Sequence, residues 1–203
     1  MNIASHNSFS YLPVRRWWMW PFRWMARCQR VDFDRQLELG VGLFDIRIRY
    51  TENNDLIICH GLMEYRHPKR WTYTETFLGD FFDKLNKKGG YCRVVLETNK
   101  PDSHQEDHFR SYCYYLQTVY RNIHFFGGNN RTDWGCKNPI FDFGTKLEDL
   151  DDKYSSTTNL FPWAWMRRLD DLCPIIYAKL HNKENVKKGT THKWLFIDFV
   201  DIR

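Results

Sequence analysis

Charged residues inside an apolar strand are the feature that most constrains how this chain can fold. Residues 43–49 read LFDIRIR, where the apolar positions favour a buried strand and Asp45, Arg47 and Arg49 are charges that such a strand normally excludes. Asp45 and Arg47 are two residues apart and share one face, so they could simply neutralise each other inside a barrel. The other explanation is that these charges serve a functional site.

A histidine ends each of two further apolar runs. His6 follows the short run 3–5 at the start of the chain, and His60 follows the run 56–59 and precedes Gly61. Polar groups at the point where a strand gives way to a loop form the active sites of α/β barrels. A single histidine of this kind is more often structural, but two histidines and an arginine at the ends of separate strands predict an active site.

Strands and helices alternate along the chain, which is typical of a parallel α/β barrel. With 203 residues and no linker, repeat or low-complexity tract, the chain is expected to form one domain spanning 1–203. The predicted fold is α/β, a compact and distorted TIM (β/α)₈ barrel with trimmed helices, because such barrels usually need about 250 residues. Strands are expected at 3–5, 43–49, 56–59, 91–97, 122–126, 139–143, 174–180 and 194–200, helices at 32–39, 72–85 and 104–120, and an acidic loop or short helix at 147–156.

Three parts of the sequence together resemble a known catalytic motif. The segments His6-Asn7-Ser8, Gln36 to Arg49 and His60-Gly61 follow the order H-D-S, Q-(L/M)-x-x-G-x-R-x-F-D-I-R-x-R and H-G. This order resembles the phosphatidylinositol-specific phospholipase C X domain, in its bacterial, metal-independent form. The segment 194–200 resembles that family's last barrel strand. The resemblance covers roughly residues 1–100 and 190–203 and implies a phosphodiesterase on a TIM barrel.

The resemblance implies a role for each residue of the motif. Cleavage of a phosphodiester by a neighbouring hydroxyl needs a base, an acid and positive charge on the phosphate. By resemblance, His6 is the base, supported by Asp198, and His60 is the acid. Arg47 would hold the phosphate where metal-dependent relatives place a carboxylate ligand for Ca²⁺, so no cofactor is expected. Asp45 would orient Arg47 or a histidine.

Two departures from the bacterial pattern leave alternatives open. Asn7 stands where the bacterial enzymes have an aspartate, and Glu97 stands where the metal-dependent enzymes have a glutamate ligand. Asn7, Asp45 and Glu97 could therefore form a partial oxygen site for Ca²⁺, although Arg47 would repel the ion.

Glu97 has two further explanations. It could support His60, or it could form a salt bridge with Lys100 or Arg93.

Substrate contacts are also suggested in the middle of the chain. A lysine that contacts inositol in the bacterial enzymes is replaced here by Asn99, with Lys100 beside it. Arg131 and Trp134 could approach the substrate from the rim of the barrel, or they could belong to an ordinary surface loop.

The segment 12–27 after the first strand is rich in tryptophan and arginine. Trp17, Trp18, Trp20 and Trp24 are interspersed with four arginines, and Pro21 interrupts any longer helix. Amphipathic tryptophan rings and guanidinium groups suit a membrane interface, and the matching rim segment of the lipase family carries a Trp that inserts into bilayers. Alternatively, the segment is a lid whose Trp residues pack on the barrel while its Arg residues bind a soluble phosphate.

Composition narrows the compartment and the partners. The six cysteines have no C-x-x-C spacing, which favours free thiols in a reducing compartment and disfavours a zinc site. The first strand leaves no room for a cleavable signal peptide, and no apolar run reaches the roughly 18 residues of a membrane span. We therefore expect a cytoplasmic monomer with peripheral membrane contact.

The net charge of +5 favours phosphate-bearing partners without choosing among them. Nucleic acid is disfavoured because the basic residues are confined to one Trp-rich segment.

Three hypotheses follow from the sequence. The first is a metal-independent phosphodiesterase of the phospholipase C type, acting on a phosphoinositide or related lipid. The second keeps the catalytic residues but takes a soluble phosphodiester, such as a glycerophosphodiester or cyclic nucleotide. The third is a phospholipid-binding or phosphate-binding module of the same fold that has lost turnover.

Overall fold

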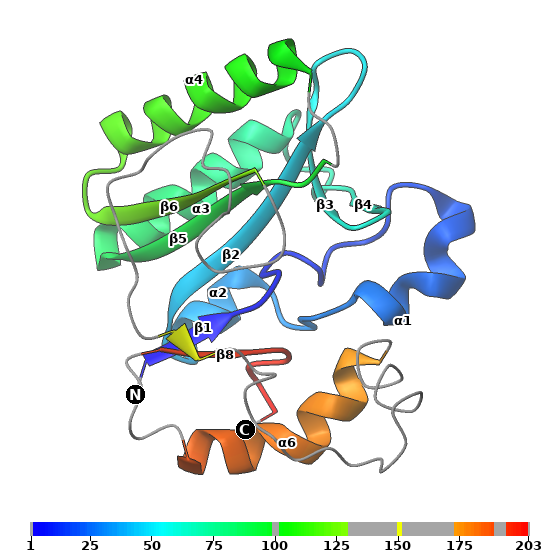
Figure 1. Cartoon of the computed structure of the whole chain (residues 1–203), viewed down its shortest axis with the longest axis vertical. Helices are drawn as coiled ribbons and strands as arrows, with labels where there is room; N and C mark the ends of the chain where they lie inside the picture. Colours follow the sequence, from blue (N-terminus) through cyan, green and yellow to red (C-terminus); the bar gives the residue numbers. More distant parts are fainter. Residues whose placement is uncertain (1, 99–101, 130–149, 152–172, 189–193, 203) are drawn as a thin grey trace.

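A computed structural model of the chain describes residues 2–98, 102–129, 150–151, 173–188 and 194–202 (Figure 1). Its elements are β1 (Asn2–Ser5), the 3₁₀ helix η1 (Trp17–Phe22), α1 (Arg23–Ala26), α2 (Phe33–Glu38), β2 (Val41–Tyr50), β3 (Leu56–His60), β4 (Met63–Tyr65), α3 (Thr74–Lys88), β5 (Gly90–Leu96), α4 (Ser103–Val119), β6 (Ile123–Asn129), β7 (Leu150–Asp151), α6 (Pro174–Lys188) and β8 (Trp194–Ile197).

The strands form one curled sheet with β2 at its centre. Parallel strands follow the order β6-β5-β2-β1-β8-β7, so the first and last strands of the chain are neighbours. Figure 1 shows α3 and α4 beside β5 and β6, whereas α6 lies beside β8. This mixed α/β arrangement confirms the prediction of a distorted barrel of the TIM type: within the described residues the sheet curls as a half-barrel.

The strand expected at 56–59 exists, but it is not a parallel barrel strand. β3 runs antiparallel to the end of β2, and β4 pairs antiparallel with β3. The reason is the short connection after Tyr50, where Asn54 adopts a left-handed conformation with φ of 62°. A parallel crossover needs about a dozen residues or more, so this connection permits only a hairpin. Consequently β5, expected as the fourth strand, lies directly beside β2.

The strand expected at 174–180 is wrong, because this segment forms the first half of α6. Buried positions recur at 174, 177, 178, 181 and 182, which is the spacing of one helix face. Pro174 occupies the first turn, where a helix tolerates the missing N–H. The isoleucines favoured a strand, and the helical period was hidden because two of its inward residues, His181 and Asn182, are polar.

The three predicted helices are confirmed. The helices at 32–39, 72–85 and 104–120 correspond to α2, α3 and α4, and Asp32 caps α2 by accepting a hydrogen bond from the Arg35 backbone N–H at 2.9 Å.

The segment 147–156 was expected to be a loop or short helix, but its residues 150–151 form β7. That assignment depends on pairing with β8, a long-range contact that carries no local signal. The strand expected at 139–143 lies outside the described residues.

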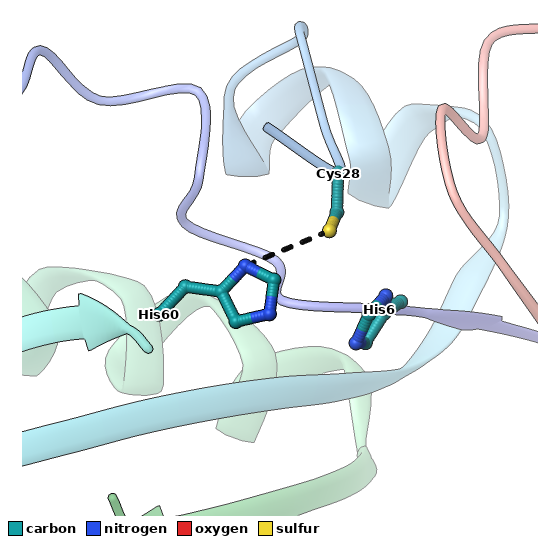
Figure 2. Close-up of side chains that lie close together, drawn as sticks. All are labelled: His6, Cys28 and His60. Atoms are coloured by element: carbon teal, nitrogen blue, oxygen red, sulfur yellow. Dashed lines mark hydrogen bonds between the residues drawn. The ribbon is translucent and has the colours of Figure 1, made fainter. Parts of the chain in front are cut away.

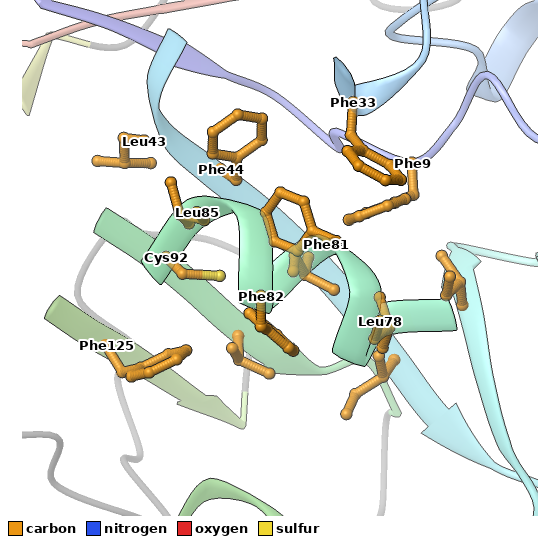
Figure 3. Packing of buried hydrophobic residues seen from close by; sticks show 14 of the residues in the cluster. Phe9, Phe33, Leu43, Phe44, Leu78, Phe81, Phe82, Leu85, Cys92 and Phe125 are labelled. Atoms are coloured by element: carbon orange, nitrogen blue, oxygen red, sulfur yellow. The ribbon is translucent and has the colours of Figure 1, made fainter. Parts of the chain in front are cut away.

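Aromatic packing holds the centre of the sheet in place. Phe81 of α3 packs edge-on against Phe44 of β2, with ring centroids 5.0 Å apart, and against Phe9 at 5.1 Å (Figure 3). Phe33 of α2 joins the same cluster at 5.4 Å from Phe81. Each such pair contributes about 0.5–1.5 kcal/mol beyond the burial of its area. The loop after β1 is therefore fixed against β2, where the candidate site lies.

Candidate active site

Four of the predicted site residues meet at the ends of β1, β2, β3 and β8. His6 lies between two partners: its Nδ1 is 2.7 Å from Asp198 Oδ1, and its Nε2 is 2.7 Å from Arg47 Nη2. Arginine only donates hydrogen bonds, so Nε2 accepts from Arg47 and the Nδ1–H donates to Asp198. His60 faces this group, with its ring centroid 5.6 Å from that of His6 at an angle of 82° (Figure 2).

The backbone around His6 is tightly held. The His6 N–H donates to the carbonyl of Ile197 in β8 at 3.1 Å, and the Ser8 N–H donates to the carbonyl of Asp45 in β2 at 2.8 Å. Asn7 and Phe199 have positive φ values of 41° and 49°, and each directly follows a member of the His6–Asp198 pair. Such conformations cost about 1–3 kcal/mol and persist only where surrounding contacts impose them.

Asp45 is the electrostatic anchor of the site. It is fully buried and accepts from Arg47 Nε at 3.0 Å, from Arg93 Nη1 at 2.9 Å and from the Asn7 N–H at 3.1 Å. Burial by itself would raise the pKa of Asp45, but the two guanidinium groups outweigh it and hold this pKa well below its ordinary value. The predicted neutralisation of Arg47 by Asp45 is therefore present, and Arg47 also contacts His6.

Glu97 connects Arg47 to the turn that carries His60. Its Oε1 lies 3.6 Å from Arg47 Nη1 and accepts the Gly61 N–H at 3.0 Å. Arg49 donates to the Gly61 carbonyl from the other side. Gly61 has φ of 58°, a conformation that other residues adopt at a penalty. Glu97 and Arg49 thus fix the backbone directly after His60.

The surroundings of His60 lower its pKa and so disfavour the protonated ring. Its Nδ1 is 2.9 Å from the Ala26 carbonyl, an acceptor, and 3.9 Å from Cys28 Sγ. Burial is the main cause that lowers the pKa of His60 below its ordinary 6.5, and the charge of Arg47 lowers it further, while Glu97 raises it. The Nδ1–H donates to Ala26, which leaves Nε2 as the nitrogen able to take up a proton.

Asn7 stands apart from these satisfied groups. It is fully buried, yet neither Oδ1 nor Nδ2 of its amide has a hydrogen-bond partner among the described residues. An unsatisfied buried polar group costs about 1–3 kcal/mol.

The substrate contacts suggested in the middle of the chain lie outside the described residues: Asn99, Lys100, Arg131 and Trp134.

Several supporting residues were missed as site residues. Gln29 donates to the carbonyls of His6 and Ile197, each at 3.1 Å. Gln36 accepts from Ser5 Oγ at 2.6 Å and donates to the Ser8 carbonyl at 2.8 Å. The side chain of Asn182 in α6 donates to the Asp198 carbonyl at 2.7 Å. Gln36 begins the motif that resembles the phospholipase family, whereas Gln29 and Asn182 carry no local signal that gives their partners.

Cys28 and Arg93 were not recognised as site residues either. Cys28 lies after α1 and Arg93 on β5, and both reach the site only through the packing of the sheet.

The Trp/Arg-rich rim segment, residues 12–27, forms one side of the site without burying its tryptophans. Trp17 is 81% exposed and Trp20 67% exposed, and Trp18 and Trp24 are also exposed. Pro21 falls inside η1, so the broken helix predicted here is a 3₁₀ turn followed by α1. Each of the four tryptophans is at least half exposed, and the membrane contact and the lid both stay predictions. None of the helices in the described part of the chain has the length and apolarity that a membrane span requires.

A cavity of about 300 Å³ lies between the rim segment and α6. It is lined by Trp20, Trp24, Arg23, Arg27 and Phe199, among others. Phe199 directly follows Asp198 in the chain, and the cavity combines apolar and cationic side chains.

The fold and the sequence both have relatives among known proteins. No family model matches the chain. The solved structure of a phosphatidylinositol-specific phospholipase C from Staphylococcus aureus superposes with a TM-score of 0.61 at 19% identity, covering 98% of this chain and 85% of that one. The enzyme of the same name from Listeria monocytogenes superposes with a TM-score of 0.60 at 17% identity, covering 98% and 87%. The chain has the fold of the bacterial phosphatidylinositol-specific phospholipases C.

Sequence comparison agrees with this phospholipase C likeness. Two curated proteins of S. aureus, both named 1-phosphatidylinositol phosphodiesterase and from strains Newman and NCTC 8325, are 28% identical to the chain over 179 residues. The match covers 79% of this chain but only 51% and 48% of those proteins. The chain thus spans about half the length of the curated phospholipase C relatives it matches.

Proposed function

We propose that this protein is a metal-independent phosphodiesterase of the phospholipase C type that acts on a phospholipid at a membrane surface. The observation that carries the proposal is the position of His6 between Asp198 and Arg47, with the second imidazole of His60 facing it. An oriented base, a facing acid and a fixed cation are the three groups that this reaction needs.

His6 is the general base in this proposal. With its Nδ1–H donated to Asp198, the lone pair of Nε2 points to Arg47. When a substrate phosphate draws the Arg47 Nη2 group away, Nε2 becomes free to take a proton from a neighbouring hydroxyl. Asp198 then stabilises the imidazolium that forms.

Arg47 stabilises the phosphate, and Asp45 keeps it in place. Its Nε stays bound to the buried carboxylate of Asp45, so the remaining nitrogens of the fork are aimed without rotating freely. A fixed guanidinium in a buried site needs little reorganisation as negative charge develops on the phosphate oxygens.

His60 is the general acid that protonates the leaving oxygen. Its pKa lies below 6.5 in the free protein because of burial and Arg47, and a bound anionic phosphate raises it toward protonation. If the product is a cyclic phosphate that water opens, the two histidines exchange roles.

A lipid substrate is supported by the rim segment and by Asn7. The exposed Trp17, Trp18 and Trp20 suit an interface between water and lipid, and the adjoining cavity combines apolar and cationic walls. The unpaired amide of Asn7 offers a donor and an acceptor to a bound head group. The S. aureus relatives are named for phosphatidylinositol, which makes this lipid the first substrate to test.

Calcium has no role in this proposal. Both oxygens of Asp45, which would be central to the Asn7–Asp45–Glu97 alternative, already accept from guanidinium groups.

The proposal is tested by ³¹P NMR of the purified protein with phosphatidylinositol in mixed micelles containing EDTA. We expect a cyclic inositol phosphate signal from the wild-type protein, loss of that signal in His6→Ala and His60→Ala, and an unchanged signal in His104→Ala, which removes an exposed histidine of α4. Turnover only with Ca²⁺ would contradict metal independence. Turnover of glycerophosphodiesters but not of the lipid would contradict the substrate, and binding without any turnover would contradict the enzyme.

A further inference from the structure

Two histidines and a cysteine from separate segments gather at one point of the candidate active site. His6 ends β1, Cys28 follows α1 and His60 ends β3, and one potential ligand atom from each lies within 4.8 Å of the other two (Figure 2). Within the described residues, this is the only group of three histidine, cysteine or acidic side chains that meets this spacing. Imidazole and thiolate together are the ligands preferred by zinc and similar metals.

One ligand pair, Cys28 and His60, has a separation close to that in a bound transition metal site. Zinc binds nitrogen at about 2.0–2.1 Å and sulfur at about 2.3 Å, so a tetrahedral site separates these two atoms by about 3.6 Å. The observed separation between Cys28 Sγ and His60 Nδ1 is 3.9 Å. His60 Nδ1 donates to the Ala26 carbonyl in the metal-free protein, so metal binding moves the ring proton to Nε2 and replaces this hydrogen bond as the side chains rotate toward the ion. Three protein ligands leave a fourth position for water.

The surrounding charge is compatible with a cation. The other buried charged residues of the described chain are the carboxylates Asp45, Glu97 and Asp198 and the guanidinium groups Arg47 and Arg93. Arg47 opposes the ion, because its Nη2 occupies His6 Nε2 at 2.7 Å. A Cys28 thiolate would add a negative charge, and Arg47 keeps its bond to Asp45 when it leaves His6.

We infer that His6, Cys28 and His60 form a binding site for a thiophilic divalent metal ion of the Zn²⁺ type, and that its occupation blocks both histidines. The sequence disfavoured zinc because it contains no C-x-x-C spacing, but these ligands are brought together by three separate segments. The inference of metal binding is drawn from the His6–Cys28–His60 cluster alone, whereas the inference of inhibition rests on the proposed function. The ion is an inhibitor here and supplies no step of the reaction.

Metal binding at this cluster is tested by adding Co²⁺ and then Zn²⁺ to the metal-free protein. We expect a thiolate-to-Co²⁺ charge-transfer band that Zn²⁺ displaces at one equivalent. Cys28→Ala should abolish the band and weaken Zn²⁺ binding by about tenfold or more, while Cys113→Ala, which removes another fully buried thiol, should not. His60→Gln gives a second test that does not depend on the folding of Cys28→Ala, and it should weaken binding similarly. A band that persists in Cys28→Ala would overturn the site.

The inhibition half is tested by titrating Zn²⁺ into the phosphodiesterase assay, with each variant compared with its own metal-free rate. We expect inhibition of the wild type and of Cys113→Ala that a chelator reverses, and an inhibitory concentration about tenfold or more higher for Cys28→Ala. Full activity with the Co²⁺ band present would overturn inhibition. A band in a protein that has no metal-free activity on any substrate would support the metal site and contradict the proposed function.

Discussion

The buried site and the rim segment use the same residue type in opposite ways. In the site, Arg47 and Arg93 are buried and share one carboxylate, Asp45. In the rim segment, Arg16 lies at the surface, where it pairs with Glu64 at 3.2 Å beside the exposed Trp17 and Trp18. One region holds its charges by many internal contacts, and the other presents them outward.

This difference determines what a mutation in each region does. Breaking a buried ion pair leaves a charge without compensation and destabilises a protein by about 3–5 kcal/mol. Replacing exposed side chains usually changes stability by less than about 0.5 kcal/mol. Truncations that remove a buried charge of the site should therefore affect folding and catalysis together, whereas replacements of the same shape should act mainly on catalysis. Mutations in the rim segment should affect binding alone.

The largest effect is expected for Asp45→Ala. It removes the shared partner of Arg47 and Arg93 and should lower the free energy of unfolding by about 3–5 kcal/mol. Urea denaturation measures this change. Asp34→Ala is the control, since its exposed pair with Lys84 contributes about 1 kcal/mol or less. Equal changes in the two variants would show that the buried anchor is no stronger than a surface pair.

Asp198→Asn should come next, with an effect on catalysis rather than on folding. Asparagine can turn its amide N–H toward His6 and favour the wrong tautomer of the ring, so we expect kcat to fall by about 10²-fold to 10⁴-fold. Initial rates with phosphatidylinositol, together with a thermal melt, measure this. Asp201→Asn, three residues away in the pair with Arg30, should retain the wild-type rate. A normal rate in Asp198→Asn would remove His6 from the role of base.

The combined replacement of Trp17, Trp18 and Trp20 by alanine should weaken binding to phospholipid vesicles by about tenfold or more. The free energy of unfolding should change little, because no residue of η1 is buried. Vesicle sedimentation measures the affinity for phospholipid vesicles, and urea denaturation measures the free energy of unfolding. Tyr114→Ala is the matched control, as it removes an aromatic side chain on α4 that is 66% exposed. Vesicle binding that survives in the triple variant would place the membrane contact elsewhere.

The smallest expected effect is a shift in the pH profile of Glu97→Gln. As the acid, His60 must carry a proton, so kcat/KM falls as the pH rises through its pKa. Glu97 raises the pKa of His60, and its loss should move the alkaline limb to lower pH. Rates measured across pH 4–9, against Glu75→Gln on α3 as control, test the direction. A shift to higher pH would contradict His60 as the acid.

Much of the fold could be predicted because local signals were strong. Asp32 caps α2, and the aromatic spacing of α3 marks its buried face. The two failures have different causes: one left a local signal unused, and in the other tertiary contacts overrode a local signal. The apolar run 56–59 is a strand in either arrangement, and only its short connection makes it antiparallel. The run 174–180 has strand-like isoleucines, but it begins a helix whose buried face continues through His181 and Asn182. The Asn182 side chain donates to the carbonyl of Phe199, in the chain after β8.

The candidate site was also predictable only in part. The order of His6, Asp45, Arg47, His60 and Asp198 could be recognised by resemblance, and the structure brings these residues together. Their partners could not be recognised, because Gln29 and Cys28 bind groups that are distant in sequence.

The sequence by itself determined the local elements of this protein and the residue types of its site, because periodicity, capping and motif order act over short stretches of chain. Only the tertiary structure decided which side chains meet. His6 and Asp198 are 192 residues apart and become neighbours because β8 pairs with β1. Cys28 reaches His60 because the segment after α1 folds over the end of β3. Strand order and register set these contacts, and both depend on packing across the whole sheet.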